Sequence, residues 1–133
     1  MATIQRFEDL EIWQLARMLE NKIFALTKNA PLAKDFSLKD QINRSSGSVM
    51  DNIAEGYGRG SRLEFIQFLS IASGSADEVK SQLYRCLDRE YILKEKFDEL
   101  YNDAFVLNKK INGFMKYLNT TATRGTKFKD RTK

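Results

Sequence analysis

Histidine is absent from the 133 residues of this sequence, which also contains only one cysteine and one proline. Histidine is the commonest general base near neutral pH and the commonest metal ligand, so the usual catalytic and metal chemistry has no side chain to use. A single cysteine cannot form an internal disulfide bond, which is usual in the reducing cytoplasm. We therefore expect a cytoplasmic protein that is not an enzyme and needs no metal or cofactor.

Long apolar runs are also missing. No stretch approaches the roughly 18 residues that cross a bilayer, and residues 1–7 lack the apolar segment of a secretory signal. We expect no membrane partner. The hydrophobic fraction of 42% is nevertheless ordinary for a soluble globular protein. A chain of this length is enough for one domain with a real core.

Charge is distributed unevenly. Residues 1–119 contain 17 basic and 17 acidic side chains, so the net charge of +4 lies entirely in residues 120–133. The basic residues there are Arg124, Lys127, Lys129, Arg131 and Lys133. We expect residues 1–119 to form the folded domain and residues 120–133 a flexible basic arm. Such an arm favours polyanions through counterion release, and the alternative is an end that only improves solubility.

Apolar residues recur at helical spacing in four segments. They predict helices over residues 9–28, from Ser37 to a glycine-rich turn at 56–61, over 61–89 and over 94–118. The stripes are Ile12, Ala16, Leu19, Ile23 and Leu26; Ile42, Ser46, Val49 and Ile53; Phe65, Leu69, Ala72, Ala76, Val79, Leu83 and Cys86; and Phe97, Leu100, Ala104, Leu107, Ile111, Phe114 and Leu118. These stripes and the short connections predict an all-α, up-down-up-down four-helix bundle.

Polar and small residues predict the helix boundaries and contacts. Ser37 is a suitable N-cap for the second helix, and Ser61 stands three residues before Glu64, which is the spacing of a capping box. The glycine run at 56–60 lacks the spacing of a phosphate-binding loop, so we interpret it as a helix end and turn. We expect Gly47 and Gly74 to mark close packing of the second helix on the third, because mid-helix glycine costs about 1 kcal/mol elsewhere.

Further apolar residues flank the stripes of the last two helices. They are Leu63, Ile66, Phe68, Ile71, Tyr84, Leu87, Tyr101, Phe105 and Met115. A single seam in a monomeric bundle of this size cannot hide them all, so we expect an oligomer.

Few residues are candidates for chemistry. Cys86 falls on a core stripe, where we expect it to pack as a small apolar residue. Glu55 and Glu78 could face each other across two helices, but the known carboxylate metal sites of bundles also need histidine. Asn52 and Glu55 precede the predicted turn. They fit a hydrogen-bonded turn better than a binding site, and both interpretations stay open.

Several motifs together resemble a known family. They are Phe7–Gln14, Gln41 with Arg44, Asn52–Arg59, and Ala72–Ser75 with Glu78. In this order they resemble the bacterial four-helix bundle proteins, also called 23S rRNA intervening-sequence proteins, over about residues 6–118. The resemblance implies a left-handed up-down bundle that often forms a ring-like pentamer. It also implies relatives encoded within large-subunit rRNA genes, and similar accessory subunits that bind nucleic acid and a reverse transcriptase.

The same resemblance points to a small set of residues. It draws attention to Arg44, Asn52, Glu55 with Gly56, Arg59 and Glu78, without a catalytic role for any. Asn43 stands where relatives often have a second arginine, which reduces the positive charge of this face.

Two hypotheses follow for function. The first is an oligomer associated with RNA, such as rRNA, or with DNA. Its candidate phosphate contacts are Arg44, Arg59, Arg62, Arg85, Arg89, Lys127, Lys129 and Arg131. The alternative is a scaffold or accessory subunit that binds sister copies and a protein partner through its apolar flanks, without touching nucleic acid.

Overall fold

The computed structural model describes residues 3–124, and the side chains of residues 3–120. The described residues form four α-helices and two short 3-10 turns and include no strand. The elements are η1 (Phe7–Asp9), α1 (Glu11–Thr27), η2 (Leu32–Lys34), α2 (Phe36–Gly58), α3 (Arg62–Asp88) and α4 (Lys94–Arg124). The predicted four-helix bundle is confirmed.

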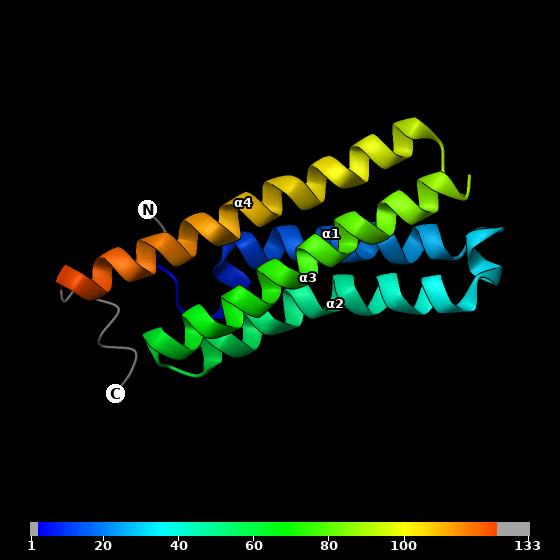
Figure 1. Cartoon of the computed structure of the whole chain (residues 1–133). Coiled ribbons are helices and arrows are strands. Elements are labelled where there is room, and N and C mark those ends of the chain that lie inside the picture. The colour runs from blue at the N-terminus through cyan, green and yellow to red at the C-terminus, as the bar shows by residue number, and fades with distance from the viewer. Residues whose placement is uncertain (1–2, 125–133) are drawn as a thin grey trace.

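Consecutive helices are neighbours in the bundle (Figure 1). α1 packs against α2 and α4, and α3 packs against the same two helices. The α1–α2 and α3–α4 connections lie at one end, which we call the connection end (residues 28–35 and 89–93) (Figure 1). The α2–α3 turn (residues 59–61) and the last turns of α4 lie at the opposite end, the turn end (Figure 1).

The core consists of the predicted stripes. Except for Leu26 and Phe114, which are only partly covered, every stripe residue is buried. Edge-to-face contacts join Tyr57 to Phe65 and Phe65 to Phe114, with ring centroids 6.0 and 5.6 Å apart. The 3.6-residue period therefore determined the inward face of each helix.

The cap of α2 differs from the prediction. Asp35, and not Ser37, is the N-cap, and its carboxylate accepts a hydrogen bond from the Leu38 amide at 3.2 Å. Helix α2 already begins at Phe36, so Ser37 lies inside the first turn and cannot cap it. The predicted cap of α3 is confirmed, because the Ser61 hydroxyl accepts from the Glu64 amide at 3.3 Å.

The glycines were only partly predicted. Helix α2 continues through Gly58, and the reversal is made at Gly60, whose φ of 72° suits glycine. The close approach of α2 and α3 is at Gly56, where an added Cβ would lie 2.6 Å from Phe68 Cβ. The prediction that Gly47 and Gly74 mark this approach was wrong, since a Cβ at either position meets nothing within 4 Å.

Both ends of α4 are informative. The predicted end at Leu118 was wrong, because α4 continues to Arg124. Before α4, the Tyr91 amide donates a hydrogen bond to the Cys86 carbonyl at 2.8 Å. The Glu90 amide donates one to the Leu87 carbonyl at 2.9 Å. This is a Schellman ending for α3, in which Glu90 takes the left-handed conformation with φ of 59°. A non-glycine residue there explains why the sequence showed no strong breaker.

Candidate functional site

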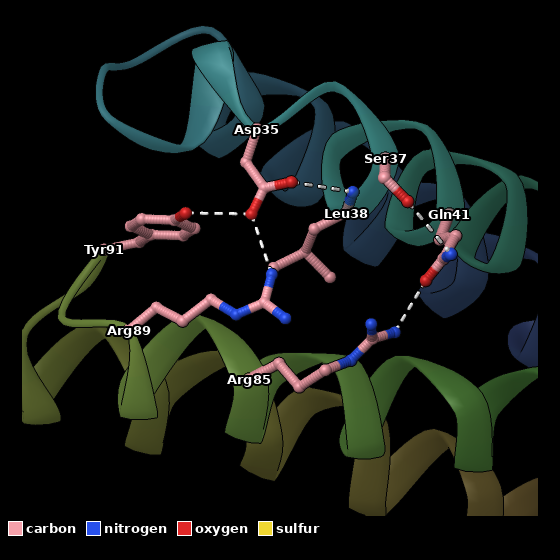
Figure 2. Close-up of polar contacts among 7 residues, drawn as sticks. All are labelled: Asp35, Ser37, Leu38, Gln41, Arg85, Arg89 and Tyr91. Carbon is pink, nitrogen blue, oxygen red and sulfur yellow. Dashed lines mark hydrogen bonds and ion pairs between the residues drawn. The ribbon is translucent and has the colours of Figure 1, made fainter.

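Asp35 joins the two chain connections at the connection end (Figure 2). Besides capping α2, its carboxylate accepts hydrogen bonds of 2.8 Å from the Tyr91 hydroxyl and from the Arg89 guanidinium. The pKa of Asp35 is lowered, first by the Tyr91 hydrogen bond, then by the Leu38 amide and by Arg89. The bond to Asp35 in turn raises the pKa of Tyr91. Arg89, a predicted phosphate contact, is thus held by an internal carboxylate.

Arg85 is engaged in the same way one turn earlier on α3. Its guanidinium donates to the Gln41 side-chain oxygen at 2.6 Å, and the Gln41 amide donates to the Ser37 hydroxyl at 3.3 Å (Figure 2). Arg85 therefore bridges α3 to α2, and its contact with a phosphate would compete with this bridge.

Arg44 is the most accessible of the predicted arginines whose side-chain exposure is known. Its side chain is 79% exposed, and its partner is Asp40, one turn away at 3.8 Å. Exposed pairs at this spacing contribute only about 0.3–0.5 kcal/mol. Arg44 is therefore available to a ligand at little cost.

Arg59 and Arg62 lie at the turn end. Arg59 pairs with Glu55 at 2.8 Å and lies 5.0 Å from the centre of the Phe68 ring. The Nε atom of Arg62 is buried and has no hydrogen-bond partner among the described residues. The Glu55 carboxylate thus holds the Arg59 guanidinium at the end of α2.

The structure does not gather the predicted arginines on one face. Arg85 and Arg89 occupy the connection end, while Arg59 and Arg62 occupy the turn end. Along α2 alone, Arg44 and Arg59 are separated by about 22 Å. The remaining candidates, Lys127, Lys129 and Arg131, lie outside the described residues.

The residues of the family motif organise the α2–α3 contact. Asn52 donates to the Ser48 carbonyl at 2.8 Å and to its hydroxyl at 2.9 Å. That hydroxyl shares a hydrogen bond of 2.8 Å with Ser75 of α3. Asn52 therefore supports the helix contact and not the turn itself. Glu78 is exposed on α3 and has no ion pair among the described residues.

A cluster of aromatic side chains lies on the α3–α4 face, and the sequence predicted only part of it. Tyr84, Phe97 and Tyr101 lie with ring centroids 4.9–5.6 Å apart. The Lys80 ammonium lies 5.8 Å from the centre of the Tyr101 ring and 5.7 Å from that of Phe105. The apolar stripes and the positions beside them predicted the aromatic residues of this face. The sequence pattern did not predict that Lys80 lies near their rings.

The flanking apolar residues are buried to different degrees. Ile66, Leu87, Tyr101 and Met115 are partly buried against the core. Phe68 is half-buried, whereas Leu63, Ile71, Tyr84 and Phe105 remain exposed. Sequence reasoning missed Phe36 and Leu93, each 75% exposed at the connection end. They could have been found in the sequence as large apolar residues that belong to no helical stripe.

Cys86 is fully buried, as predicted. Burial raises the pKa of its thiol to about 11, which disfavours the thiolate. Among the described residues, no group of three or more histidine, cysteine or acidic side chains is arranged to hold a metal ion.

Comparison with known proteins decides the family. A model of the 23S rRNA-intervening sequence proteins matches residues 8–113. The chain belongs to this family. A solved structure similar to it is a protein of unknown function from the S23 ribosomal protein family of Bacteroides thetaiotaomicron. It shares 29% identity and a TM-score of 0.73, over 79% of this chain and 98% of the other.

A search of curated proteins found no match to this chain. Within the described residues, no helix is both long and apolar enough to cross a membrane.

Proposed function

We propose that this protein has no enzymatic activity and assembles with copies of itself, so that the bundle serves as an interaction scaffold. One observation carries the proposal. The core is closed within a single chain, yet eleven large apolar side chains of the described residues remain exposed. Phe36 and Leu93 expose three quarters of their surface at the same end of the bundle. Burial of apolar surface at about 25 cal/mol per Å² would favour association.

The chemistry of the chain supports a role without catalysis. It contains no histidine, and its one thiol is buried with a pKa of about 11. Two polar groups that the sequence singled out, Asn52 and Arg85, are engaged in contacts within the bundle. These groups hold the scaffold together.

Light scattering coupled to size exclusion tests the proposal. We expect one fixed oligomer from about 1 to 100 µM, because specific interfaces of standard area dissociate in the micromolar to picomolar range. A monomer throughout this range would overturn self-assembly.

Association with RNA is the second candidate function, and the family supports it. The net charge of +4 in residues 120–133 also supports it. The bundle contributes less, because Arg85, Arg89 and Arg59 already have internal acceptors. Arg44, with its exposed and weak pair, is the best candidate contact of the bundle.

A salt titration of binding to a labelled single-stranded RNA tests this second function. Removal of residues 125–133 keeps α4, which ends at Arg124. If this segment contacts phosphates, we expect the slope of log K against log salt to fall in magnitude by about 3, since four basic contacts leave and each contributes about 0.7 on a single strand. Arg44→Ala should lower the magnitude of this slope by about 1. Lys28→Ala is the matched surface control and should leave the slope unchanged. A slope unchanged by the truncation would exclude the segment as an RNA contact.

A further inference from the structure

The charges of α4 divide between its two parts. Residues 94–103 contain four acidic and two basic residues, whereas residues 104–124, which we call the basic part of α4, contain four basic residues and no acidic one. The helix dipole favours cations only within the last turn of a helix. Lys109 and Lys110 lie about four turns before Arg124, so the dipole does not explain their presence.

The lysines of the basic part of α4 are exposed on its outward side. Lys110 pairs with Glu11 of α1 at 3.4 Å. Lys109 and Lys116 form no ion pair with any residue that the structure describes. Two ammonium groups on this surface are therefore available to an anionic ligand without loss of an internal bond.

The acidic residues of the neighbouring elements do not neutralise this surface. Asp77 of α3 pairs with Lys80 at 3.2 Å, and Asp103, just before the basic part, pairs with Lys22 at 2.8 Å. The acidic residues of η1 belong to an element that packs against α1 and α2. The basic part of α4 thus keeps its positive charge in the folded bundle.

Two aromatic rings are exposed along the same part of α4. Phe105 and Tyr117 are each 43% exposed, and Tyr117 stacks on Phe114 with ring centroids 6.0 Å apart. The ammonium groups of Lys80 and Lys109 each lie 5.7 Å from the centre of the Phe105 ring. Nucleobases stack on aromatic side chains while neighbouring cations contact the phosphates. Exposed rings with cations beside them therefore suit a single-stranded nucleic acid better than an acidic protein segment.

We propose that the basic part of α4 binds single-stranded RNA, with Lys109 and Lys116 on phosphates and a base stacked on Phe105. This inference rests on the association with RNA given above as the second candidate function, and it names the surface of the bundle that takes part. Phe36 and Leu93, which support self-assembly, lie at the connection end. The basic part of α4 leads to the turn end (Figure 1), so the two functions use different surfaces.

Single substitutions in the full-length chain test this surface, with a labelled single-stranded RNA of about 12 nucleotides. Lys109→Ala and Lys116→Ala should each lower the magnitude of the slope of log K against log salt by about 0.7. Phe105→Ala should weaken binding about 5- to 100-fold at every salt concentration and leave the slope unchanged, because stacking releases no counterion. Thermal denaturation verifies that each variant is folded.

Phe24 and Lys28 of α1 provide a matched control. They stand four positions apart, as Phe105 and Lys109 do, and Phe24 is 47% exposed with the Lys28 ammonium 4.6 Å from the centre of its ring. Phe24→Ala and Lys28→Ala should leave both the affinity and the slope unchanged. Equal losses from the pair on α1 and the pair on α4 would overturn the assignment to α4.

The outcomes separate this surface from the association with RNA itself. A wild-type chain that binds no RNA at low salt overturns both. If Phe105→Ala and Lys109→Ala leave binding unchanged while removal of residues 125–133 abolishes it, the surface is overturned and the association with RNA stands. Duplex RNA bound as tightly as the single strand, or polyglutamate that competes as well as RNA at equal charge, overturns the stacked base.

Cross-linking locates the contact independently of affinity. A single-stranded RNA that carries iodouridine is irradiated with the wild-type chain, and mass spectrometry identifies the attached residue. We expect attachment at Phe105 or Tyr117. Attachment at Phe24 or Phe36, and at neither ring of α4, overturns the inference.

Discussion

The Tyr91 hydroxyl donates a hydrogen bond of 2.8 Å to the carboxylate of Asp35, 56 positions earlier in the chain. The contact ties the connection before α2 to the connection before α4 (Figure 2). Asp35 also caps α2 and accepts a hydrogen bond from Arg89. One carboxylate therefore joins the start of α2, the end of α3 and the connection before α4. Since the three contacts share one carboxylate, its loss should weaken the whole connection end.

Asp35 should make stability depend on pH in the acid range. Its folded pKa is lowered by Tyr91, the Leu38 amide and Arg89, so its contribution is complete above the unfolded pKa of about 3.9. That contribution is lost as the pH falls through the lower, folded pKa. We expect Asp35→Asn to be less stable than wild type at pH 7, and the difference to shrink below about pH 4. Urea denaturation at several pH values measures this, with Asp40→Asn as control. A difference that stays constant down to pH 2 would contradict it.

Gly56 should be the glycine that the bundle cannot replace. A Cβ at this position would meet the Phe68 Cβ at 2.6 Å and the Phe65 ring at 3.0 Å. We expect Gly56→Ala to lower the free energy of unfolding by about 1–3 kcal/mol through overpacking. Gly47→Ala on the same helix meets open space and should raise it by about 0.5–1 kcal/mol. Thermal and urea denaturation distinguish the two. Equal effects would show that α3 does not approach α2 at Gly56.

Glu90 offers a stabilising substitution. It takes the left-handed position of the Schellman ending, with φ of 59°, where a side chain is strained and glycine is not. We expect Glu90→Gly to raise the free energy of unfolding by about 0.5–1 kcal/mol. Glu90→Ala keeps the Cβ and should change it by less than about 0.5 kcal/mol. Destabilisation by Glu90→Gly would mean that the glutamate side chain makes a contact that outweighs the strain.

Cys86 should be unreactive while the bundle is folded. The thiol has a pKa of about 11 in the folded chain and about 8.5 in the unfolded chain. At pH 8 the thiolate fraction is therefore about 100-fold or more lower in the folded chain than in the unfolded one. We expect iodoacetamide to alkylate the native chain at least 100-fold more slowly than the chain in 6 M guanidinium chloride. Mass spectrometry of timed samples measures both rates. Similar rates would show that α3 opens readily at Cys86.

The sequence predicted most of the architecture. The stripe from Phe65 to Cys86 and the stripe from Phe97 to Leu118 follow the helical period without a break, and nearly all of their residues are buried. The spacing of Ser61 and Glu64 also predicted the N-cap of α3 correctly, since a cap depends on groups only a few residues apart. Local chemistry of this kind can be read without knowing the rest of the fold.

The candidate site was less predictable. Arg85 and Arg89 looked available for phosphate, but the structure places Gln41 and Asp35 beside them. Gly47 and Gly74 looked like contact points, but Gly56 is the one that faces another helix. A helical pattern gives the face that a residue occupies and leaves open the rotation and register against its neighbour.

The sequence by itself determined that there are four helices, which face of each is apolar, and where the net charge lies. These follow from spacing and composition along one segment at a time. Only the tertiary structure decided that Asp35 meets Tyr91, and that an apolar hollow opens between Leu26 and Leu93. Both depend on bringing distant segments into one register, which packing of the whole core settles and no local pattern encodes.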